Sequence, residues 1–432
     1  MFDRHEGGEN AVLVHVDFAV QARGDNREEL EEFIELVTSA GITILDMVTT
    51  KRQAPHAKFY LGKGKMEDLC DAVKVHQADV VLFNHTLTPA QERNIEEVCQ
   101  CRVVDRIGLI LDIFAQRAST YEGKLQVELA QLKHMSTRLI RGWTHLERQK
   151  GGIGLRGPGE TQLETDRRLL RGRIKSIENR LDKVSRQRNQ GRRSRSRAEV
   201  PTVSLVGYTN AGKSTLFNQI TGANVLAADK LFATLDPTLR RVEVAKGQPI
   251  ILADTVGFIR HLPHDLVAAF RATLEETREA DLLLHVIDFA DPTWQEKEKA
   301  VQQVLNEIGA EKVAILKVMN KVDLLGDIES GILRDEHQEI QEVRVSAKSE
   351  LGVEQLLEAI SELLAGDRID CSITIPPEHG KLRGLLFQLH AIREESYLDD
   401  GSLQLSINLA LVDWMRLKQK LHLDLDQFID SK

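Results

Sequence analysis

Short apolar runs alternate with amphipathic stretches along the first 115 residues of the chain. Apolar runs of this length are typical of strands, and apolar positions at helical spacing are typical of helices. Strands are expected at 11–20, 42–48 and 79–83, and helices at 27–40, 65–76 and 88–99. This alternation predicts a small α/β domain with a parallel sheet. The glycine-lysine repeat at 62–65 lacks the spacing and the Ser/Thr of a phosphate loop, so we interpret it as a basic turn entering a helix.

From residue 117 to 190 the pattern changes to apolar positions that step by four and three. The two series are Leu125, Leu129, Leu132, Ser136 and Leu139, and Leu170, Ile174, Ile177, Leu181 and Val184. Such spacing predicts the two seams of an antiparallel helical hairpin. The link at 151–160 holds five glycines and a proline, so it is expected to be a non-helical tip. The run at 192–197 (RRSRSR) is interpreted as an exposed basic linker.

Beyond residue 200, apolar runs again alternate with amphipathic stretches, and four of the runs end at a polar segment. These runs are 202–206, 250–253, 313–319 and the one that ends at Val345. After residue 372 the pattern is shorter and predicts a compact α+β appendage. Extended chain is expected at 372–375, a helix at 379–390 and a hairpin around 399–401.

The composition is that of an ordinary globular protein with several domains. A chain of 432 residues is too long for one core and predicts about three domains of ordinary size. No run approaches the ~20 apolar residues that a membrane span needs, and the N-terminus is too polar for a signal peptide. The four cysteines form no CxxC pair, so we expect reduced thiols in a cytoplasmic protein without membrane insertion.

The net charge of −9 hides a division along the chain. Residues 137–197 carry 18 Lys/Arg against 6 Asp/Glu, a net charge of +12, whereas the rest of the chain carries −21. Because acidic flanks repel nucleic acid, a basic block inside an acidic protein favours docking to nucleic acid at one place. A solvated charged helix face is the alternative interpretation.

The first polar segment is a phosphate loop. The strand at 202–206 runs directly into GYTNAGKS at 207–214, the GxxxxGKS pattern, and then into a helical stretch. Backbone N–H groups from Asn210 onward are expected to hold phosphates at the helix N-terminus. Lys213 is expected to reach the β and γ phosphates, and the Ser214 hydroxyl to coordinate Mg²⁺.

The three later segments complete the expected nucleotide site and predict that it selects guanine. In Asp254-Thr-Val-Gly257 the carboxylate is expected to hold Mg²⁺ through water, and the Gly257 N–H to meet the γ-phosphate. In Asn320-Lys-Val-Asp323 an ionised Asp accepts both the imino and the amino proton of guanine. Adenine offers no such pair of donors and would leave Asp323 unpaired. In Ser346-Ala-Lys348 the Ala347 N–H is expected to donate to the guanine carbonyl.

A switch segment lies between the phosphate loop and the Asp254 motif. It reads Phe232-Ala-Thr-Leu-Asp-Pro-Thr238, and it offers two threonines that could close on Mg²⁺ and the γ-phosphate. We prefer Thr234 over Thr238. The residues with a catalytic role are then Lys213, Thr234, Asp254 and Gly257. The complete set expected at GTP is Gly207, Tyr208, Thr209, Asn210, Ala211, Gly212, Lys213, Ser214, Thr215, Phe232, Ala233, Thr234, Leu235, Asp236, Asp254, Thr255, Val256, Gly257, Asn320, Lys321, Val322, Asp323, Ser346, Ala347 and Lys348.

Two positions bear on hydrolysis. Phe258 stands where many GTPases have a glutamine that positions water, and its apolar ring cannot do so, so unaided hydrolysis should be slow. Asn210 stands where related GTPases use an asparagine to help bind an activating K⁺. A side-chain hydrogen bond that stabilises the loop is the alternative role of Asn210.

These motifs resemble the translation-factor-related GTPases, and the whole chain from about 10 to 430 is similar to the HflX family of ribosome-associated GTPases. The more specific signature is GGIGLRGPGETQLETDRR at 151–168, outside the nucleotide motifs. The resemblance implies cytoplasmic association with the large ribosomal subunit, and GTP-dependent splitting of stalled 70S ribosomes under heat stress. It also implies that the tip at 151–159 reaches toward the peptidyl-transferase region. Some members hydrolyse ATP as well, through their N-terminal region.

The glycine-rich tip and the arginines beside it are the expected contacts with ribosomal RNA. Gly152, Gly154 and Gly157 also satisfy GxGxxG, but no strand precedes them, so a dinucleotide site is rejected. A glycine loop lets backbone N–H groups and a guanidinium approach phosphates closely, and a flexible connector is the alternative. The expected RNA-binding residues are Gly152, Gly154, Arg156, Gly157, Arg167, Arg168 and Arg171.

The prediction is therefore an α/β protein in four parts. They are an N-terminal α/β domain (1–115), a basic helical hairpin with a glycine-rich tip (116–199), a P-loop GTPase domain with a mostly parallel sheet (200–366) and a small C-terminal α+β domain (367–432). We expect a monomer. Two other function classes stay open: a GTPase switch associated with RNA or tRNA modification, and a signalling or membrane-linked GTPase.

Overall fold

The computed structural model describes most of the chain. The described residues are 9–18, 25–142, 158–197, 200–222, 231–232, 234–245, 248–260, 271–326, 328–365, 368–389, 391–398, 401–410, 414, 417–418, 421, 423 and 425–430. They form two compact units. One comprises residues 1–242 and 249–353, and the other comprises residues 243–248 and 354–432.

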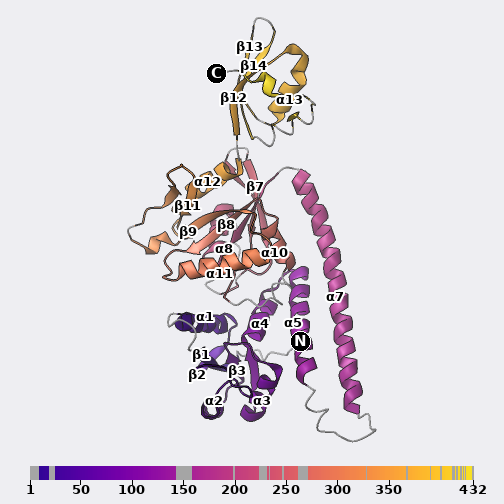
Figure 1. Cartoon of the computed structure of the whole chain (residues 1–432), viewed down its shortest axis with the longest axis vertical. Coiled ribbons are helices and arrows are strands. Elements are labelled where there is room, and N and C mark those ends of the chain that lie inside the picture. The colour runs from indigo at the N-terminus through magenta and orange to yellow at the C-terminus, as the bar shows by residue number, and fades with distance from the viewer. Residues whose placement is uncertain are drawn as a thin grey trace. The chain divides into compact units, whose positions relative to one another are not determined.

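The first part of the larger unit is the predicted parallel α/β layer (Figure 1). Its strands β1 (Asn10–Phe18), β2 (Thr43–Arg52), β3 (Val80–Phe83) and β4 (Arg102–Asp105) pair in the order β2-β1-β3-β4, each parallel to its neighbour. The helices are α1 (Asp25–Ser39), α2 (Lys63–His76), α3 (Pro89–Cys99) and α4 (Arg106–Arg117). The predicted strands and helices of this region are confirmed.

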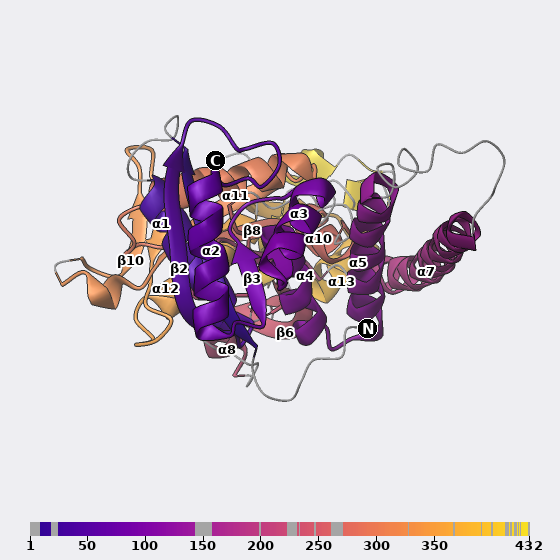
Figure 2. The same ribbon diagram turned by 90° about the horizontal axis from the view of Figure 1, so that it is seen from below.

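The helices cover both faces of this sheet. Apolar residues of α1 and α4 share one core with one face, and those of α2 and α3 share another core with the opposite face. Figure 2 shows α2 and α3 on the side nearest the viewer. Because the sheet is covered on both faces, β3 has all four of its residues buried, as expected for a continuous apolar run. The turn at 62–65 does enter a helix, with Gly62 at the N-cap of α2.

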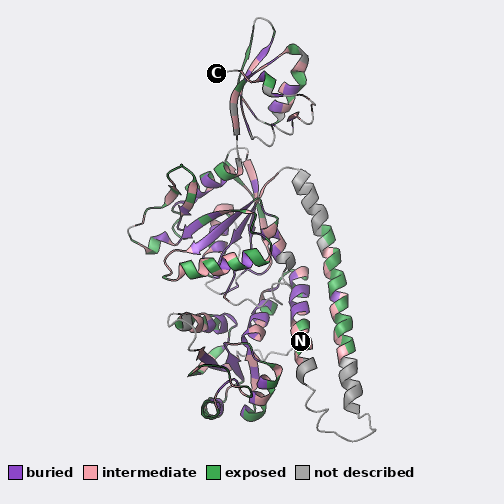
Figure 3. Ribbon diagram, viewed as in Figure 1, coloured by how far each residue is buried: buried purple, intermediate pink, exposed green. Residues whose placement is uncertain are grey.

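The helical hairpin consists of α5 (Tyr121–Gly142) and α7 (Pro158–Arg197), which lie side by side in Figures 1 and 2. The predicted seams meet: Leu125, Leu129 and Ile177 are buried together, with Leu132, Ile174 and Leu181 packed against them. Many other residues of α7 are exposed, as Figure 3 shows.

Two details of the hairpin differ from expectation. Helix α7 already starts at Pro158, inside the predicted tip, because proline at the first position of a helix sacrifices no hydrogen bond. The predicted linker at 192–197 is wrong, since α7 continues to Arg197. Arginine is a good helix former, and no proline interrupts the run.

Apart from residues 243–245 and 248 of β6 and β7, a seven-stranded sheet belongs to the larger unit. Its strands are β5 (Thr202–Val206), β6 (Thr238–Ala245), β7 (Gln248–Asp254), β8 (Leu282–Asp288), β9 (Ala314–Asn320), β10 (Gly331–Arg334) and β11 (Ile340–Arg344), in the order β10-β11-β9-β8-β5-β7-β6. The strands from β11 to β7 are parallel, and β10 joins antiparallel at the edge. The helices are α8 (Lys213–Thr221), α10 (Arg271–Arg278) and α11 (Trp294–Glu307), with a 3-10 turn at Val322–Leu324. The mostly parallel sheet is confirmed.

The smaller unit contains α12 (Val353–Ala365) and a three-stranded antiparallel sheet of β12 (Arg368–Ile375), β14 (Leu403–Ala410) and β13 (Ile392–Tyr397). Helix α13 (Gly380–Gln388) and two 3-10 turns, Pro377–His379 and Leu425–Phe428, complete it. Its core is built around the fully buried Trp414. The predicted α+β character, with extended chain, helix and hairpin in that order, is confirmed. In neither unit is any of the described helices both long enough and apolar enough to cross a membrane.

Candidate nucleotide-binding site

The parallel sheet brings the four polar segments to one edge. Strands β5, β7, β9 and β11 end at Val206, Asp254, Asn320 and Arg344, and each leads into one of the segments. Because these strands are parallel, their carboxyl ends share an edge, where α/β sheets bind their ligands. Residues separated by more than a hundred positions in sequence therefore form one site.

The shape of the phosphate loop depends on two glycines. Gly207 and Gly212 both have positive φ, +149° and +93°. A Cβ at Gly207 would lie 2.2 Å from the carbonyl oxygen of Val286, and one at Gly212 would lie 2.2 Å from Nδ2 of Asn320. Gly212 precedes α8 and offers no side chain to cap it. The N–H groups of the first turn of α8 thus stay available to an anion.

Lys213 is buried inside the loop that it belongs to. Its Nζ donates to the carbonyl oxygens of Gly207 (3.1 Å) and Tyr208 (2.8 Å), so the side chain folds back over the loop. Burial lowers the pKa of Lys213 to about 8, and the nearby Asp254 carboxylate opposes this shift. An anion such as a phosphate would favour the charged ammonium.

Three side-chain oxygens converge beside this lysine. The Ser214 hydroxyl lies 2.8 Å from that of Thr234, and both donate to Oδ2 of Asp254, at 2.7 and 2.9 Å. The other oxygen of Asp254 is buried and has no hydrogen-bond partner. Burial raises the pKa of Asp254, and the hydrogen bond from Ser214 is the largest influence that lowers it. Thr238, the alternative to Thr234, is instead the first residue of β6.

This oxygen set fits Mg²⁺. Hydroxyls and a carboxylate are the hard ligands that Mg²⁺ prefers, and the unpartnered Asp254 oxygen can accept from a metal-bound water. No group of three or more His, Cys, Asp or Glu side chains suited to a metal occurs in the part of the chain that the structure describes. The Ser214–Thr234–Asp254 cluster combines hydroxyls with one carboxylate, as expected when phosphate oxygens complete the coordination.

The segment after β7 is joined to the phosphate loop by backbone hydrogen bonds. The N–H of Thr209 donates to the carbonyl of Phe258 (2.8 Å), and the N–H of Phe258 donates to the carbonyl of Gly207 (3.1 Å). A Cβ at Gly257 would lie 2.8 Å from Cγ2 of Thr209 and 3.0 Å from Nζ of Lys213, so only glycine fits there. The Phe258 side chain is 1% exposed. It is part of the core and does not face the site.

Asn320 joins the phosphate loop to the segment at 346–348. Its Nδ2 donates to the carbonyl of Ala211 (2.8 Å), and its Oδ1 accepts from the N–H of Ala347 (3.0 Å). The Ala347 N–H that we expected to meet guanine is thus already engaged. Lys321 has a positive φ of 66° and pairs with Asp288 at 2.6 Å. Asp323 is exposed on the 3-10 turn, where a base could reach it.

The remaining predicted residues fall into three groups. Thr215 belongs to the first turn of α8, the Thr255 hydroxyl donates to the carbonyl of Leu205 (2.5 Å), and Val256, Val322 and Ser346 are buried. Phe232, Leu235 and Asp236 contact other parts of the larger unit. Phe232 packs edge-on against Phe114 with ring centres 4.6 Å apart, and Asp236 binds the start of α5. Ala233 lies outside the described residues, and Lys348 is exposed.

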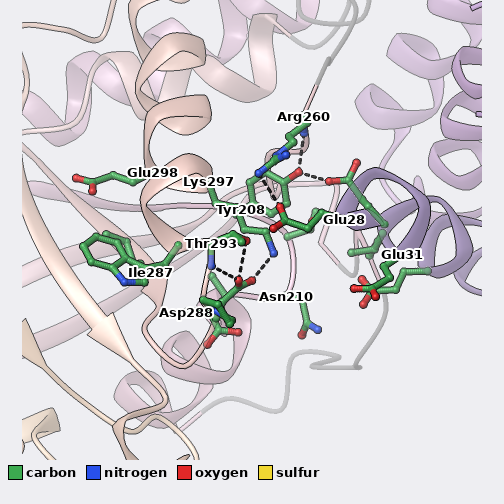
Figure 4. Close-up of a pocket in the computed structure, with 18 of the residues that line it drawn as sticks. Glu28, Glu31, Tyr208, Asn210, Arg260, Ile287, Asp288, Thr293, Lys297 and Glu298 are labelled. Carbon is green, nitrogen blue, oxygen red and sulfur yellow. Dashed lines mark hydrogen bonds and ion pairs between the residues drawn. The ribbon is translucent and has the colours of Figure 1, made fainter. Parts of the chain in front are cut away.

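A cavity of about 610 Å³ borders the phosphate loop (Figure 4). Its wall contains residues 208–211 of the loop, the start of α11, and Glu28, Glu31, Glu32 and Glu35 of α1. Asn210 lies on this wall and has a positive φ of 61°. Arg260 donates to Glu28 at 2.9 Å and to Glu296 at 2.7 Å.

A chain of hydrogen bonds continues from this wall into the N-terminal layer, which consists of β1 to β4 and α1 to α4. Tyr208 donates to Glu32, and Glu32 also pairs with Arg106. Arg106 donates to Oδ1 of Asn84 at 2.6 Å. Sequence reasoning missed Glu28, Glu32, Arg106 and Arg260, and no local signal marks them, because each acts on a partner far away in the sequence.

The expected RNA-binding residues are only partly described. Gly152, Gly154, Arg156 and Gly157 lie outside the described residues. Arg168 and Arg171 are exposed on α7, and Arg167 is partly buried there. Of the three expected RNA-binding arginines that the structure describes, two are therefore exposed on the long helix.

Comparisons with known proteins agree with these motifs. Four family models match the chain in succession: "GTP-binding GTPase N-terminal" over 27–115, "GTP-binding GTPase Middle Region" over 117–195, "50S ribosome-binding GTPase" over 202–321 and "HflX C-terminal domain" over 332–427.

Curated relatives match over nearly the whole chain. The GTPase HflX of Escherichia coli (strain K12) is 60% identical over 417 residues, which covers 96% of this chain and 97% of the relative. The GTPase HflX of Caldanaerobacter subterraneus subsp. tengcongensis is 46% identical, covering 91% of this chain and 89% of the relative. A solved structure of a GTP-binding protein from Sulfolobus solfataricus with GDP is 25% identical, with a TM-score of 0.44, and covers 82% of this chain and 98% of that one.

Proposed function

Because this chain belongs to the HflX family of GTPases, we propose that it binds the large ribosomal subunit and uses GTP binding and hydrolysis to split stalled or idle 70S ribosomes under heat stress. The observation that carries the proposal is the match along the whole chain to GTPase HflX, which includes the hairpin region as well as the nucleotide motifs. The description "50S ribosome-binding GTPase" of the family model over 202–321 supports the large subunit as partner. Its place of action would then be the cytoplasm.

The cluster at the phosphate loop supports a Mg²⁺-dependent hydrolysis. Ser214 and Thr234 would hold the ion directly, and Asp254 would hold it through water. A bound Mg²⁺ supplies charge that stabilises the phosphoryl group being transferred. Lys213 would move from the loop carbonyls to the β and γ phosphates, and the Gly257 N–H would meet the γ-phosphate. Asp323 would select guanine by accepting two of its protons.

The residue that follows the Asp254-to-Gly257 motif cannot position the nucleophilic water. Phe258 is apolar and nearly fully buried, so it cannot orient water even after a small movement. We therefore expect slow hydrolysis by the free protein, and faster hydrolysis when the large subunit organises the switch segments. Asn210, on the cavity wall, would help to bind a K⁺ ion near the phosphates, and higher turnover in K⁺ than in Na⁺ would support this role.

The hairpin is the proposed contact with ribosomal RNA. Arg168 and Arg171 are exposed on α7, within the block of net charge +12. Arginines on an exposed helix bind phosphate oxygens and position a protein on RNA. Reversing the charge at Arg167, Arg168 and Arg171 should weaken binding to the large subunit, and unchanged binding would remove the hairpin from the interface.

The test of the proposed function is GTP hydrolysis with and without purified large subunits, alongside sedimentation of 70S particles. Stimulated hydrolysis with dissociation of 70S particles is the expected result. If hydrolysis is unchanged and nothing co-sediments, the chain remains a GTPase but the ribosome is not its partner. A non-ribosomal RNA partner would then become the leading alternative.

A further inference from the structure

Residues 231–236, which include the first part of the switch segment, contact the N-terminal layer and the hairpin. The N–H of Leu231 donates to the Ser39 hydroxyl at 3.0 Å, at the end of α1. Phe232 packs against Phe114 of α4. Asp236, two residues after Thr234, reaches the beginning of α5. Within one compact unit, the segment that carries Thr234 is therefore held by three elements that precede the nucleotide domain.

The contact of Asp236 is the most extensive of the three. Its carboxylate accepts four hydrogen bonds, from the N–H and hydroxyl of Ser119 (2.9 and 2.8 Å) and from the N–H and hydroxyl of Thr120 (2.8 and 2.6 Å). These residues directly precede α5, whose N-terminus favours a negative charge. The carboxylate thus holds the two residues that precede α5, and the Thr120 hydroxyl oxygen in turn accepts from the N–H of Gly123 in the first turn of the helix (2.9 Å).

A glycine in the first turn of α5 makes room for this carboxylate. A Cβ at Gly123 would lie 2.1 Å from Oδ1 of Asp236 and 3.1 Å from the Thr120 hydroxyl oxygen. Glycine is otherwise unfavourable inside a helix, because it costs more backbone entropy than alanine. The close approach of Asp236 provides a physical reason for glycine at this position.

The contact between Asp236 and the start of α5 links the proposed Mg²⁺ cluster to the hairpin. Asp236 is two residues beyond Thr234, whose hydroxyl belongs to the proposed Mg²⁺ cluster. On the other side, α5 packs along α7 through Leu125, Leu129 and Ile177. A movement of Thr234 toward or away from a γ-phosphate would therefore also move the start of α5, where the hairpin begins.

We propose that Asp236 is a positioning residue that couples the nucleotide state sensed at Thr234 to the base of helix α5, and so to the RNA-facing hairpin. The proposal rests on the proposed function, because the hairpin is assigned there to the ribosome. Coupling is reciprocal, so binding of the hairpin to a partner would also change the affinity of the site for GTP relative to GDP.

Hydrogen exchange of the full chain tests the coupling without ribosomes. Exchange in a peptide covering 118–126 is measured with Mg²⁺ and either GDP or a non-hydrolysable GTP analogue. In the wild type we expect exchange about tenfold slower with the analogue than with GDP. Gly123→Ala, which displaces the carboxylate, and Asp236→Asn, which removes its charge, should both reduce this difference to less than about twofold. A difference absent from the wild type, or retained in both variants, would overturn the proposal.

The controls separate coupling from simple destabilisation. Gly172→Ala adds a methyl group to α7 where no atom lies within 4 Å, and it should keep the wild-type difference. Gly123→Ala should leave the affinity for GDP within about twofold of wild type while that for the GTP analogue falls about fivefold or more. An equal loss of both affinities would mean a structural role only and would also overturn the proposal.

Large subunits added to the same variants distinguish the two proposals. If Asp236 couples as stated, stimulation of hydrolysis by the subunit falls about tenfold in Gly123→Ala, while co-sedimentation is retained. If the wild type is not stimulated at all, the ribosomal function fails. The exchange result without ribosomes then still decides whether the coupling exists.

Discussion

The hydroxyl of Tyr208, the second residue of the phosphate loop, donates a hydrogen bond to the carboxylate of Glu32 on α1. The two residues are 176 positions apart in the chain. The same hydroxyl accepts from the N–H of Arg260 at 2.8 Å, so one phenol joins the phosphate loop, the segment after β7 and the N-terminal layer. Burial raises the pKa of Tyr208 well above its usual value, and Glu32 raises it further, so the hydroxyl keeps its proton.

Replacing this phenol tests how far the junction stabilises the larger unit. Tyr208→Phe removes the hydroxyl. The backbone N–H of Arg260 and one carboxylate oxygen of Glu32 then lose this hydrogen-bond partner. We expect the free energy of unfolding to fall by about 1–3 kcal/mol, the cost of leaving buried polar groups unpaired. Chemical denaturation measures this. Tyr397→Phe is the matched control, since that side chain is 73% exposed, and an equal effect of the two changes would contradict the prediction.

Asp254→Asn should abolish the Mg²⁺ dependence of hydrolysis. The amide keeps the shape of the carboxylate but loses the charge that accepts from Ser214, Thr234 and a metal-bound water. We expect the rate of GTP hydrolysis to fall about 100-fold or more, as for other losses of charge stabilisation in a dry site. A Mg²⁺ titration of single-turnover hydrolysis measures both effects. Asp335→Asn, in the turn before β11, serves as control. A normal Mg²⁺ response in Asp254→Asn would contradict the assignment.

Asp323→Asn should change which base is bound. An asparagine amide donates where the carboxylate accepted, so it cannot take both protons from guanine. Xanthine carries a carbonyl where guanine carries its amino group, so it should bind the variant better than guanine does. Losing two hydrogen bonds to a charged acceptor predicts a loss of GTP affinity of about 100-fold or more. Competition of GTP and XTP for a fluorescent nucleotide measures this, and an unchanged preference for GTP would exclude Asp323 from the base site.

His285 predicts a loss of stability in acid. The residue is 2% exposed on β8, and burial lowers its pKa to about 4. The folded state therefore binds fewer protons than the unfolded state between pH 4 and 6.5, so stability is lost as the pH falls through this window. From pH 6.5 to 5.5 the expected loss from this residue is about 1 kcal/mol.

His285→Leu tests this dependence. The variant should lose less stability than the wild type between these pH values, as measured by thermal unfolding. His337→Leu is the control, because His337 is exposed in the turn before β11. If all three proteins show the same dependence on pH, His285 does not contribute as stated.

Much of the fold and of the site could be predicted because the signals are local. Apolar periodicity placed β1 to β3 and α1 to α3 of the N-terminal layer, though not β4 or α4, and the four-three spacing placed the two arms of the hairpin. The segments at Gly207, Asp254, Asn320 and Ser346 each follow an apolar strand. Their nearness to one another could be inferred, because parallel strands end at one edge of a sheet.

The sequence by itself therefore determined many of the elements, the order of those elements, the class of fold and the nucleotide motifs. Only the tertiary structure decided the strand order β10-β11-β9-β8-β5-β7-β6, the antiparallel edge at β10 and the choice of Thr234 as neighbour of Ser214. It alone joined Tyr208 to Glu32 and Asp236 to Thr120, across 176 and 116 positions. The physical reason is that periodicity and motifs depend on neighbours along the chain. Pairing between distant side chains depends on how whole elements pack, which no local pattern encodes.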